Sequence, residues 1–327
     1  MVGSLLVDRP PAHLRGETWR ASSDVPRNWF DVLNLVALDL TGSPPARWHW
    51  RDLVFRRGIM MTTHPNIWPL LAPMFGVPVV YLCWGLPGPS KTKLGAWIKR
   101  WRLRRILRSA RLILVNDPIT ARDVELLVRR SLSIVPYVID AAFFRFGPPT
   151  ARAEFVLVPG NIDRDEALVA EFASRGVDVV RVTLSGAAAR YHREGGHRGK
   201  VTVYEGLSFA QLRDLYLRAK VVALPLTSNH HAAGQTSVLE ALACGAPVVI
   251  SRGRTAALVE HFETVVTCAS HDVAEWLAAI DRAGRLVDER SAVLARVSEE
   301  VSRTHAPDVV ATTISRAIRN GISVEAS

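Results

Sequence analysis

The stretch from Gly234 to Ser251 most constrains the fold, because it places a glycine turn, a short helix, a second glycine and an apolar strand in close succession. Gly234 permits a tight turn at the tip of a strand, and Thr236 or Ser237 is predicted to cap the helix that follows. The N-terminus of that helix presents N–H groups and a partial positive charge to an anion, and Gly245 ends it. This order of turn, helix and strand is typical of an α/β domain. It fits a phosphate-binding site, and it also fits an ordinary connection between a helix and a strand.

Length and composition favour two α/β domains. The 327 residues are 48% hydrophobic, which is enough for two cores. No apolar run reaches the roughly 18 residues of a membrane span, and the first ten residues lack the pattern of a signal peptide. The three cysteines are scattered and favour a reducing compartment without a metal site. We therefore expect a cytoplasmic protein that needs no metal and no cofactor.

The net charge of +10 lies in the first half of the chain. Residues 1–150 contain 21 Lys and Arg against 10 Asp and Glu, whereas the remainder contains 20 against 21. Such a basic surface predicts an anionic partner. No helix-turn-helix, zinc or RNA-binding signature accompanies the charge, so a nucleic-acid partner is not expected.

Short apolar runs alternate with helical patterns, which predicts parallel sheets covered by helices on both faces. In the first half we predict strands at 31–40, 58–62, 77–83 and 112–115, and helices at 47–57, 67–75, 92–109 and 118–130. The expected domains are residues 1–140 and 141–305, and a last helix is expected over 306–321.

Four segments together resemble the group 1 family of retaining glycosyltransferases, which have the GT-B fold. Glu240 to Val248 is similar to the family's donor signature Glu-Ala-(small)-Ala-x-Gly-x-Pro-Val. The other three are similar to the elements that precede that signature: 155–161, 203–208 and 220–225. The resemblance implies two Rossmann-like domains with parallel sheets facing across a cleft, and a last helix that packs back on the first domain. It also implies an acceptor site in the first domain and a nucleoside diphosphate sugar site in the second.

Loops that follow strands carry the predicted donor site, because ligands of open parallel sheets bind at the carboxyl ends of strands. Gly160 and Asn161 permit close approach of a diphosphate, and Arg164 is either a phosphate ligand or a solvated arginine at a helix start. Asp163 and Asp165 are read as acids favoured near a helix N-terminus, not as a metal pair. The full predicted donor set is Gly160, Asn161, Arg164, Gly206, Leu207, Gly234, Gln235, Thr236, Ser237 and Glu240.

Within that set the resemblance assigns individual roles. It implies that Gly206 and Leu207 hold the nucleobase through backbone groups, while Ser208 is read as a helix cap. Glu240 lies one turn into its helix, where a carboxylate can accept hydrogen bonds from ribose hydroxyls.

The sequence departs from the family pattern near the N-terminus, where the usual glycine pair is absent, and at two positions of the expected site. Ala232 stands where many members carry an earlier glutamate, and His230 or His231 is the candidate replacement, with a surface histidine pair as the alternative. Trp84 stands where the acceptor domain often has a histidine, and His64 is the reserve acceptor-side contact. These four aromatic residues are the predicted catalytic group.

Residues 91–111 form a basic, tryptophan-containing segment with nine Lys or Arg and no acid. Seven apolar residues recur in it near helical spacing, which is typical of a membrane-surface helix. The alternative is an apolar stripe packed on the sheet with solvated charges. The predicted membrane-surface residues are Trp97, Lys99, Arg100, Trp101, Arg104 and Arg105.

The sequence therefore predicts a retaining hexosyltransferase that moves a sugar from a nucleoside diphosphate sugar to a saccharide or lipid-linked saccharide acceptor. Cell-surface polysaccharide or glycolipid synthesis on the inner face of the cell membrane is the expected setting. Two alternatives stay open. One is a non-catalytic homologue that binds sugar nucleotides or polysaccharide, and the other is a sugar-nucleotide epimerase of the same architecture.

Overall fold

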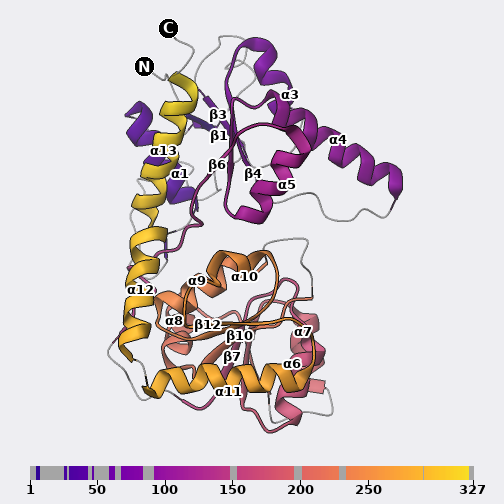
Figure 1. Cartoon of the computed structure of the whole chain (residues 1–327), viewed down its shortest axis with the longest axis vertical. Helices are drawn as coiled ribbons and strands as arrows, with labels where there is room; N and C mark the ends of the chain where they lie inside the picture. The colour runs from indigo at the N-terminus through magenta and orange to yellow at the C-terminus, as the bar shows by residue number, and fades with distance from the viewer. Residues whose placement is uncertain are drawn as a thin grey trace. The chain divides into compact units, whose positions relative to one another are not determined.

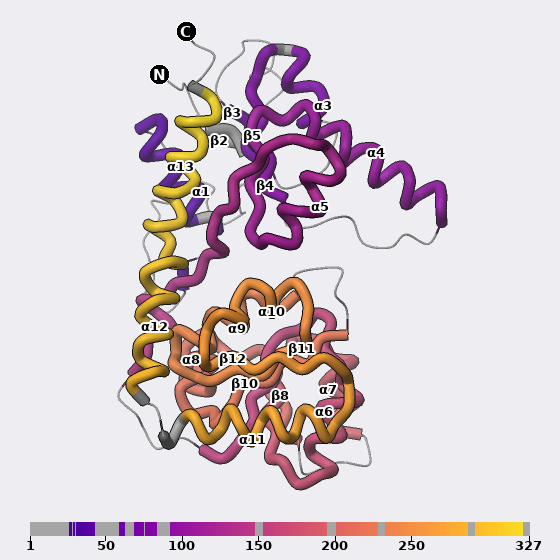
Figure 2. Tube along the Cα trace, in the orientation of Figure 1, coloured from indigo at the N-terminus to yellow at the C-terminus, as the bar shows by residue number. Residues whose placement is uncertain are grey.

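The chain forms two compact units (Figures 1 and 2). The computed structural model describes residues 5–7, 26–27, 29–42, 46–47, 59–62, 68–83, 92–147, 153–194, 201–227, 233–289 and 291–323. The first unit comprises Met1–Ala21, Arg27–Val138 and Pro307–Ser327, and the second comprises Ser22–Pro26 and Ile139–Ala306. The end of the chain thus belongs to the same unit as its beginning.

The first unit is built on a six-stranded sheet in which every pair of neighbours is parallel. The strand order is β2 (Ala46–Arg47), β1 (Leu5–Val7), β3 (Ile59–Thr62), β4 (Val79–Cys83), β5 (Leu112–Val115) and β6 (Ser133–Ile134). Parallel strands buried on both faces carry continuous apolar runs, as the fully buried β4 does.

Helices cover both faces of this sheet, and alternate strand residues serve the two cores. Val79, Tyr81 and Cys83 pack in one core with residues of α4 (Lys93–Ser109) and α5 (Pro118–Val128). Val80 and Leu82 pack in the other, with residues of α1 (Trp29–Thr41) and α13 (Pro307–Ser323). The short α3 (Trp68–Leu71) and η2 (Ala72–Phe75) precede β4.

The prediction of a strand at 31–40 is wrong, because these residues form α1. Val32, Val36 and Ala37 recur at helical spacing and are fully buried, with the buried Asp31 in the first turn. The residues between them are also largely apolar, and this hid the helical period. Burial against α13, which is far away in the sequence, selects the helix.

The second unit repeats the architecture with a second parallel sheet. Its strand order is β12 (Val265–Cys268), β11 (Val248–Ser251), β10 (Val221–Leu224), β7 (Val156–Pro159), β8 (Val179–Thr183) and β9 (Val201–Glu205). Its helices are α6 (Glu166–Ser174), α7 (Gly186–Glu194), α8 (Phe209–Arg218), α9 (Gln235–Ala243), α10 (Arg254–Val259), α11 (Val273–Glu289) and α12 (Ser291–His305). From β7 the chain builds outward to β9, then returns to the centre with β10 and builds outward to β12. The pair β7–β10 is therefore a topological switch point.

Most other predicted elements are confirmed within a few residues. The strands predicted at 58–62, 77–83 and 112–115 correspond to β3, β4 and β5, and the helices predicted at 92–109, 118–130 and 306–321 correspond to α4, α5 and α13. The predicted helix at 47–57 is not supported at its start, because Arg47 lies in β2, and its other residues fall outside the described part of the chain. In the described residues, the helices are too short or too polar to cross a bilayer.

Gly245, which follows α9, is required for two separate reasons. Its φ of 71° lies in the left-handed region, and a Cβ there would collide with the ring of Phe146. We expect Gly245→Ala to lower the free energy of unfolding by more than the roughly 1–2 kcal/mol of backbone strain alone. Urea denaturation of Gly176→Ala is the matched control, since Gly176 has a φ of 91° with open space around it. If the two variants lose the same free energy of unfolding, the ring of Phe146 moves aside without destabilising the fold, and the predicted collision does not matter.

Candidate functional site

The switch point of the second unit brings two chain turns together at the carboxyl ends of β7 and β10. The segment after β7 begins at Gly160, whose φ is 99°, and the segment after β10 reaches α9 through Gly234, whose φ is 82°. The crevice at such a point is where ligands of doubly wound sheets bind. The fold therefore places the two glycine turns predicted from sequence at one site.

Backbone hydrogen bonds tie the two turns together. The N–H of Asp165 donates to the carbonyl of Pro225 at 2.9 Å, and the N–H of Thr227 donates to the carbonyl of Asp163 at 2.9 Å. Leu226 N–H donates to Ser251 Oγ at 2.8 Å, which adds the end of β11 to the same cluster. These hydrogen bonds hold the ends of β7, β10 and β11 together at the crevice.

Arg164 fills the space between the two glycine turns. Its Nε donates to the carbonyl of Pro159 at 2.8 Å and its Nη1 donates to the carbonyl of Ile162 at 2.7 Å. A Cβ built on Gly160 would lie 2.5 Å from Nη2, and one built on Gly234 would lie 3.4 Å from it. The side chain is 7% exposed, so the alternative of a solvated arginine is wrong. Burial, with a smaller effect of nearby Arg181, lowers the pKa of Arg164 to about 10, and the group stays cationic at neutral pH.

The N-terminus of α9 carries no side-chain cap. The N-cap is Gly234, so the prediction that Thr236 or Ser237 caps the helix is wrong; both lie inside the first turn. Gln235 is 6% exposed, and its Nε2 has no hydrogen-bond partner among the described residues. Uncapped N–H groups, a buried orphan donor and the Arg164 guanidinium together make this end of the helix complementary to an anion.

Glu240 is held by a tyrosine that the sequence reading did not single out. The Tyr216 hydroxyl donates to Glu240 Oε2 at 2.9 Å, and both side chains are buried. Burial raises the pKa of Glu240 to about 8, although the bond from Tyr216 acts in the opposite direction. Glu240 Oε1 makes no hydrogen bond with any residue that the structure describes, so one carboxyl oxygen is left for a ligand.

A buried ion pair supports the turn after β7. The fully buried Arg181 of β8 binds Glu166 with two bonds of 3.0 and 2.7 Å, and its Nη1 donates to the carbonyl of Gly160 at 2.7 Å. His192 Nε2 lies 2.8 Å from the same carboxylate. Burial alone would raise the pKa of Glu166, but His192 and Arg181 outweigh it and lower the pKa to about 2. In the sequence, the only sign of this ion pair is the single charged residue, Arg181, within the apolar strand at residues 179–183.

Residues 160–285 match the family model described as Glycosyl transferases group 1. This part of the chain therefore resembles a group 1 glycosyl transferase domain. No curated protein sequence matches the chain. Among solved structures it resembles Anabaena Alr3699/HepE in complex with UDP and glucose, with 16% identity, a TM-score of 0.64, and coverage of 80% of this chain and 77% of that one.

Two further solved structures support the same fold. Sucrose-phosphate synthase from Thermosynechococcus elongatus gives a TM-score of 0.63 at 14% identity, covering 84% of this chain and 76% of that one. WaaG, a glycosyltransferase involved in lipopolysaccharide biosynthesis, gives a TM-score of 0.55 at 14% identity. The match covers 80% of this chain and 77% of WaaG. The predicted resemblance and the GT-B fold are confirmed.

The other residues predicted to bind the donor have varied surroundings. Asn161 Oδ1 accepts hydrogen bonds from Thr183 Oγ1 and from the N–H of Leu184, so it ties the β7 turn to the end of β8. Gly206 and Leu207 follow β9, the edge strand, which is two strands or about 10 Å from β7. Ser208 caps α8 in a capping box with Gln211, as predicted.

Asp163 and Asp165, which flank Arg164, have structural roles in the turn after β7. Asp165 caps α6 through a 3.0 Å bond from the N–H of Leu168, and it pairs with His271 at 2.7 Å. Asp163 adopts the left-handed region with a φ of 55°. No group of three His, Cys, Asp or Glu side chains is placed to share a metal ion within the described ranges.

The predicted catalytic group lies outside the described residues: His64, Trp84, His230 and His231. Ala232 lies outside them as well. The predicted membrane-surface residues all lie on α4 of the first unit.

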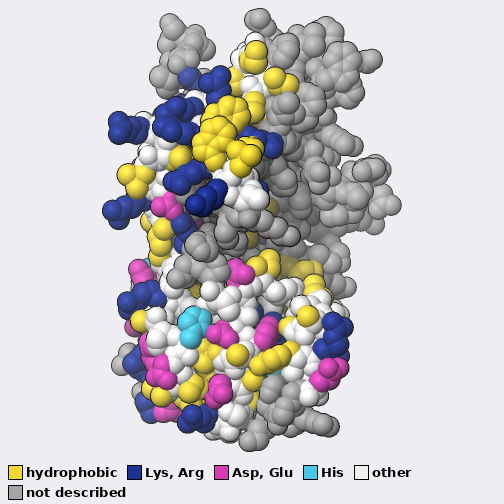
Figure 3. All heavy atoms as spheres, turned by 90° about the vertical axis from the view of Figure 1, so that its right-hand side faces the viewer, with side chains coloured by type: hydrophobic (Ala, Val, Ile, Leu, Met, Phe, Trp, Pro, Cys, Tyr) yellow, Lys and Arg dark blue, Asp and Glu magenta, His cyan; other side chains and the backbone are white. Residues whose placement is uncertain are grey.

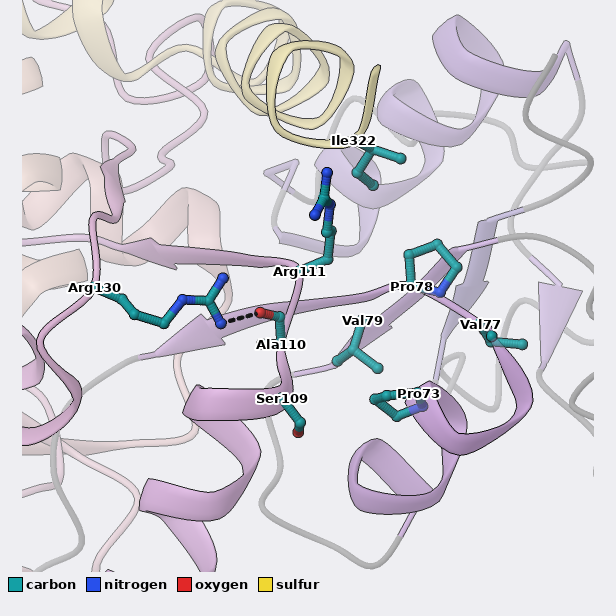
Figure 4. Close-up of a pocket in the computed structure, with 10 residues that line it drawn as sticks. Pro73, Val77, Pro78, Val79, Ser109, Ala110, Arg111, Arg130 and Ile322 are labelled. Carbon is teal, nitrogen blue, oxygen red and sulfur yellow. Dashed lines mark hydrogen bonds between the residues drawn. The ribbon is translucent and has the colours of Figure 1, made fainter. Parts of the chain in front are cut away.

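A hollow of about 510 Å³ in the first unit lies at the other end of its strands (Figure 4). It surrounds the amino ends of β4 and β5, where Arg130 Nη1 donates to the carbonyl of Ala110 at 2.7 Å. Its lining is Pro73, Gly76, Val77, Pro78, Val79, Ser109, Ala110, Arg111, Arg130 and Ile322. Because the strand ends that bind ligands in such sheets are the carboxyl ends, this hollow is not the candidate site.

The raised pKa of Glu240 predicts how stability depends on pH. Between its ordinary value of 4.5 and the folded value of about 8, the folded state binds the proton more tightly than the unfolded state. The contribution of Glu240 to stability is therefore lost as the pH rises through this window and is constant above it. Glu240→Gln removes the dependence, so its stability relative to wild type should grow with pH by up to about 1.4 kcal/mol per unit.

Urea denaturation at several pH values between about 5 and 9 measures this difference. Glu299→Gln, at an exposed position of α12, is the control for losing a carboxylate. A difference between Glu240→Gln and wild type that does not change with pH would contradict the raised pKa.

Proposed function

We propose that the protein transfers a sugar from a nucleoside diphosphate sugar to a saccharide or lipid-linked saccharide acceptor, with retention at the transferred carbon. The observation that carries the proposal is Arg164, a buried cation set between two glycine turns beside an uncapped helix N-terminus. This arrangement suits a diphosphate. The group 1 glycosyl transferase match over 160–285 includes all of these residues. Support for a nucleotide sugar also comes from the UDP and glucose bound to the Anabaena structure.

In the proposed reaction the protein acts by positioning and by electrostatics. The diphosphate lies against the first turn of α9, and Arg164 compensates the charge that grows on it as the bond to the sugar breaks. Because the cation and the N–H groups are already fixed, little reorganisation accompanies that step. Gly160 leaves room for the Arg164 guanidinium, which lies next to both glycine turns and is held there for the phosphates.

Glu240 is proposed as the ribose anchor, with Tyr216 as its positioning residue. Tyr216 occupies one carboxyl oxygen and orients the other toward a ribose hydroxyl. Gly206 and Leu207 remain the proposed nucleobase contacts, and the separation of β9 from β7 matches the reach of a nucleotide from its phosphates to its base.

On the acceptor side we propose that His64 or Trp84 contacts the acceptor and that His230 or His231 takes the place of the glutamate missing at Ala232. The proposed setting is cell-surface polysaccharide or glycolipid synthesis, in which the enzyme works peripherally on the inner face of the membrane. No metal is proposed for catalysis. A non-catalytic nucleotide-sugar-binding homologue is the second candidate, and Ala232 together with Trp84 is the observation that favours it.

The proposed division of roles predicts different losses for two variants. Arg164→Gln should weaken binding of nucleoside diphosphates by about 10- to 100-fold, since a charge-assisted hydrogen bond is worth roughly 1.5–3 kcal/mol, and should leave nucleoside binding nearly unchanged. Glu240→Ala should weaken both, because both ligands contain the ribose. Calorimetric titration with matched nucleosides and diphosphates, after a thermal-shift screen to choose the base, measures these effects.

Unchanged diphosphate affinity in Arg164→Gln would refute the phosphate role. Retained nucleoside affinity in Glu240→Ala would refute the ribose role. Far-UV circular dichroism of each variant separates these outcomes from loss of the fold.

Turnover separates the transferase from the second candidate. We expect the protein to release nucleoside diphosphate from its preferred donor only when an acceptor extract is present, and to incorporate labelled sugar in the same proportion. Arg164→Gln should lower kcat more than it raises KM, because charge builds up on the diphosphate in the transition state. Tight donor binding without transfer or hydrolysis would favour the non-catalytic homologue.

A further inference from the structure

The helix α4 has two apolar faces that belong to different halves of its length. In its C-terminal half Leu103, Ile106 and Leu107 are buried in the core of the first unit. In its N-terminal half the apolar side chains are exposed: Leu94, Trp97, Ile98 and Trp101, at 67%, 63%, 41% and 51%. At about 100° per residue, each set spans an arc of about 100°, and the two arcs lie on opposite sides of the helix. The apolar stripe of the sequence is thus half core and half unpartnered surface.

The exposed half is firmly supported. Thr92 caps the helix through a 3.1 Å bond from the N–H of Gly95, so the first turn is well formed. At the other end Arg130 Nη1 donates to the carbonyls of Arg108 and Ala110 at 2.9 and 2.7 Å, which fixes the last turn to the neighbouring α5 region. Burial of two isolated tryptophans is therefore not needed for the helix to form, and their exposure calls for another explanation.

Positive charge surrounds the exposed apolar face. The helix contains seven Lys and Arg and no Asp or Glu. Arg104, Arg105 and Arg108 continue along the side of the exposed tryptophans, and all three are exposed. None of them forms an ion pair with a carboxylate in the part of the chain that the structure describes. Figure 3 shows apolar side chains gathered on this side of the molecule with Lys and Arg around them.

We propose that the N-terminal half of α4 is the element that docks the protein on an anionic lipid bilayer, with Leu94, Trp97, Ile98 and Trp101 entering the interface. This inference rests on the proposed function only for the choice of membrane. Tryptophan suits the boundary between headgroups and acyl chains, because its ring is apolar and its N–H can stay hydrated. The arginines and lysines bind the lipid phosphates electrostatically.

Charge decides against a second copy of the chain as the occupant. A two-fold contact would place α4 against its own equivalent and bring two clusters of seven cations together. An anionic bilayer instead complements the cations and accepts the apolar face at the same time. It therefore satisfies both features of the helix.

The test is co-sedimentation of the full-length protein with vesicles of phosphatidylcholine, with and without phosphatidylglycerol. We expect binding only to the anionic vesicles, weakening as salt is added. The combined variant Lys99→Glu, Arg100→Glu, Arg104→Glu and Arg105→Glu should lose at least about 100-fold in partitioning, since each lysine or arginine near an anionic surface contributes on the order of 1 kcal/mol. The combined variant Trp97→Ala and Trp101→Ala should lose at least about tenfold.

The matched control reverses four exposed arginines outside α4: Arg175, Arg190, Arg282 and Arg316. It carries the same change in net charge, so strong binding by this control locates the effect on α4. Equal loss in the control, or full binding by both α4 variants, would overturn the proposal. So would a change in oligomeric state by analytical ultracentrifugation in the tryptophan variant without a change in vesicle binding. Nucleotide affinity should be unchanged in every variant, and this keeps failure of docking distinct from failure of the proposed function.

Discussion

The candidate site depends on one buried side chain, because Arg164 fills the space between two glycine turns. A Cβ at Gly160 would lie 2.5 Å from Nη2 and would displace the guanidinium, whereas at Gly234 the left-handed φ of 82° is what favours glycine. Its bonds to the carbonyls of Pro159 and Ile162 hold the turn after β7 in shape. Arg181 supports the same turn through a hydrogen bond from its Nη1 to the carbonyl of Gly160. Arg164 and Arg181 therefore both hold the turn after β7 in shape, and only Arg164 lies next to the crevice.

Sequence reasoning predicted this site from glycine and strand spacing together with the family resemblance. Gly160, Arg164 and Gly234 follow strands in a recognisable order, and the parallel fold then brings them together. The partners that come from distant segments were not found: Tyr216 reaches Glu240 from a helix that reads as an ordinary amphipathic segment. Arg181 was visible as a charge within an apolar strand, but its partners Glu166 and His192 lie on separate helices.

The errors in the first unit and at α9 have the same origin. In both places the local sequence pattern allowed more than one structure. Residues 31–40 are apolar nearly throughout, and packing against α13 makes them a helix. Thr236 and Ser237 are good caps by residue type, yet the left-handed Gly234 starts α9 earlier and leaves its first turn open. In α4 the sequence left core packing and surface exposure open, and the structure has both: the C-terminal apolar side chains are buried and the N-terminal ones are exposed.

The uneven charge of the chain has a simple physical explanation in these terms. The half that carries the candidate site is nearly neutral, so the proposed binding of a diphosphate rests on one desolvated cation and fixed N–H groups, which act over a few ångströms in a low dielectric. The half that carries α4 has the excess of Lys and Arg on its surface, where screening limits each charge but many act together. A small ligand needs the first arrangement, because one contact must hold it in one orientation. An extended anionic surface needs the second, because it offers many phosphates and no single geometry.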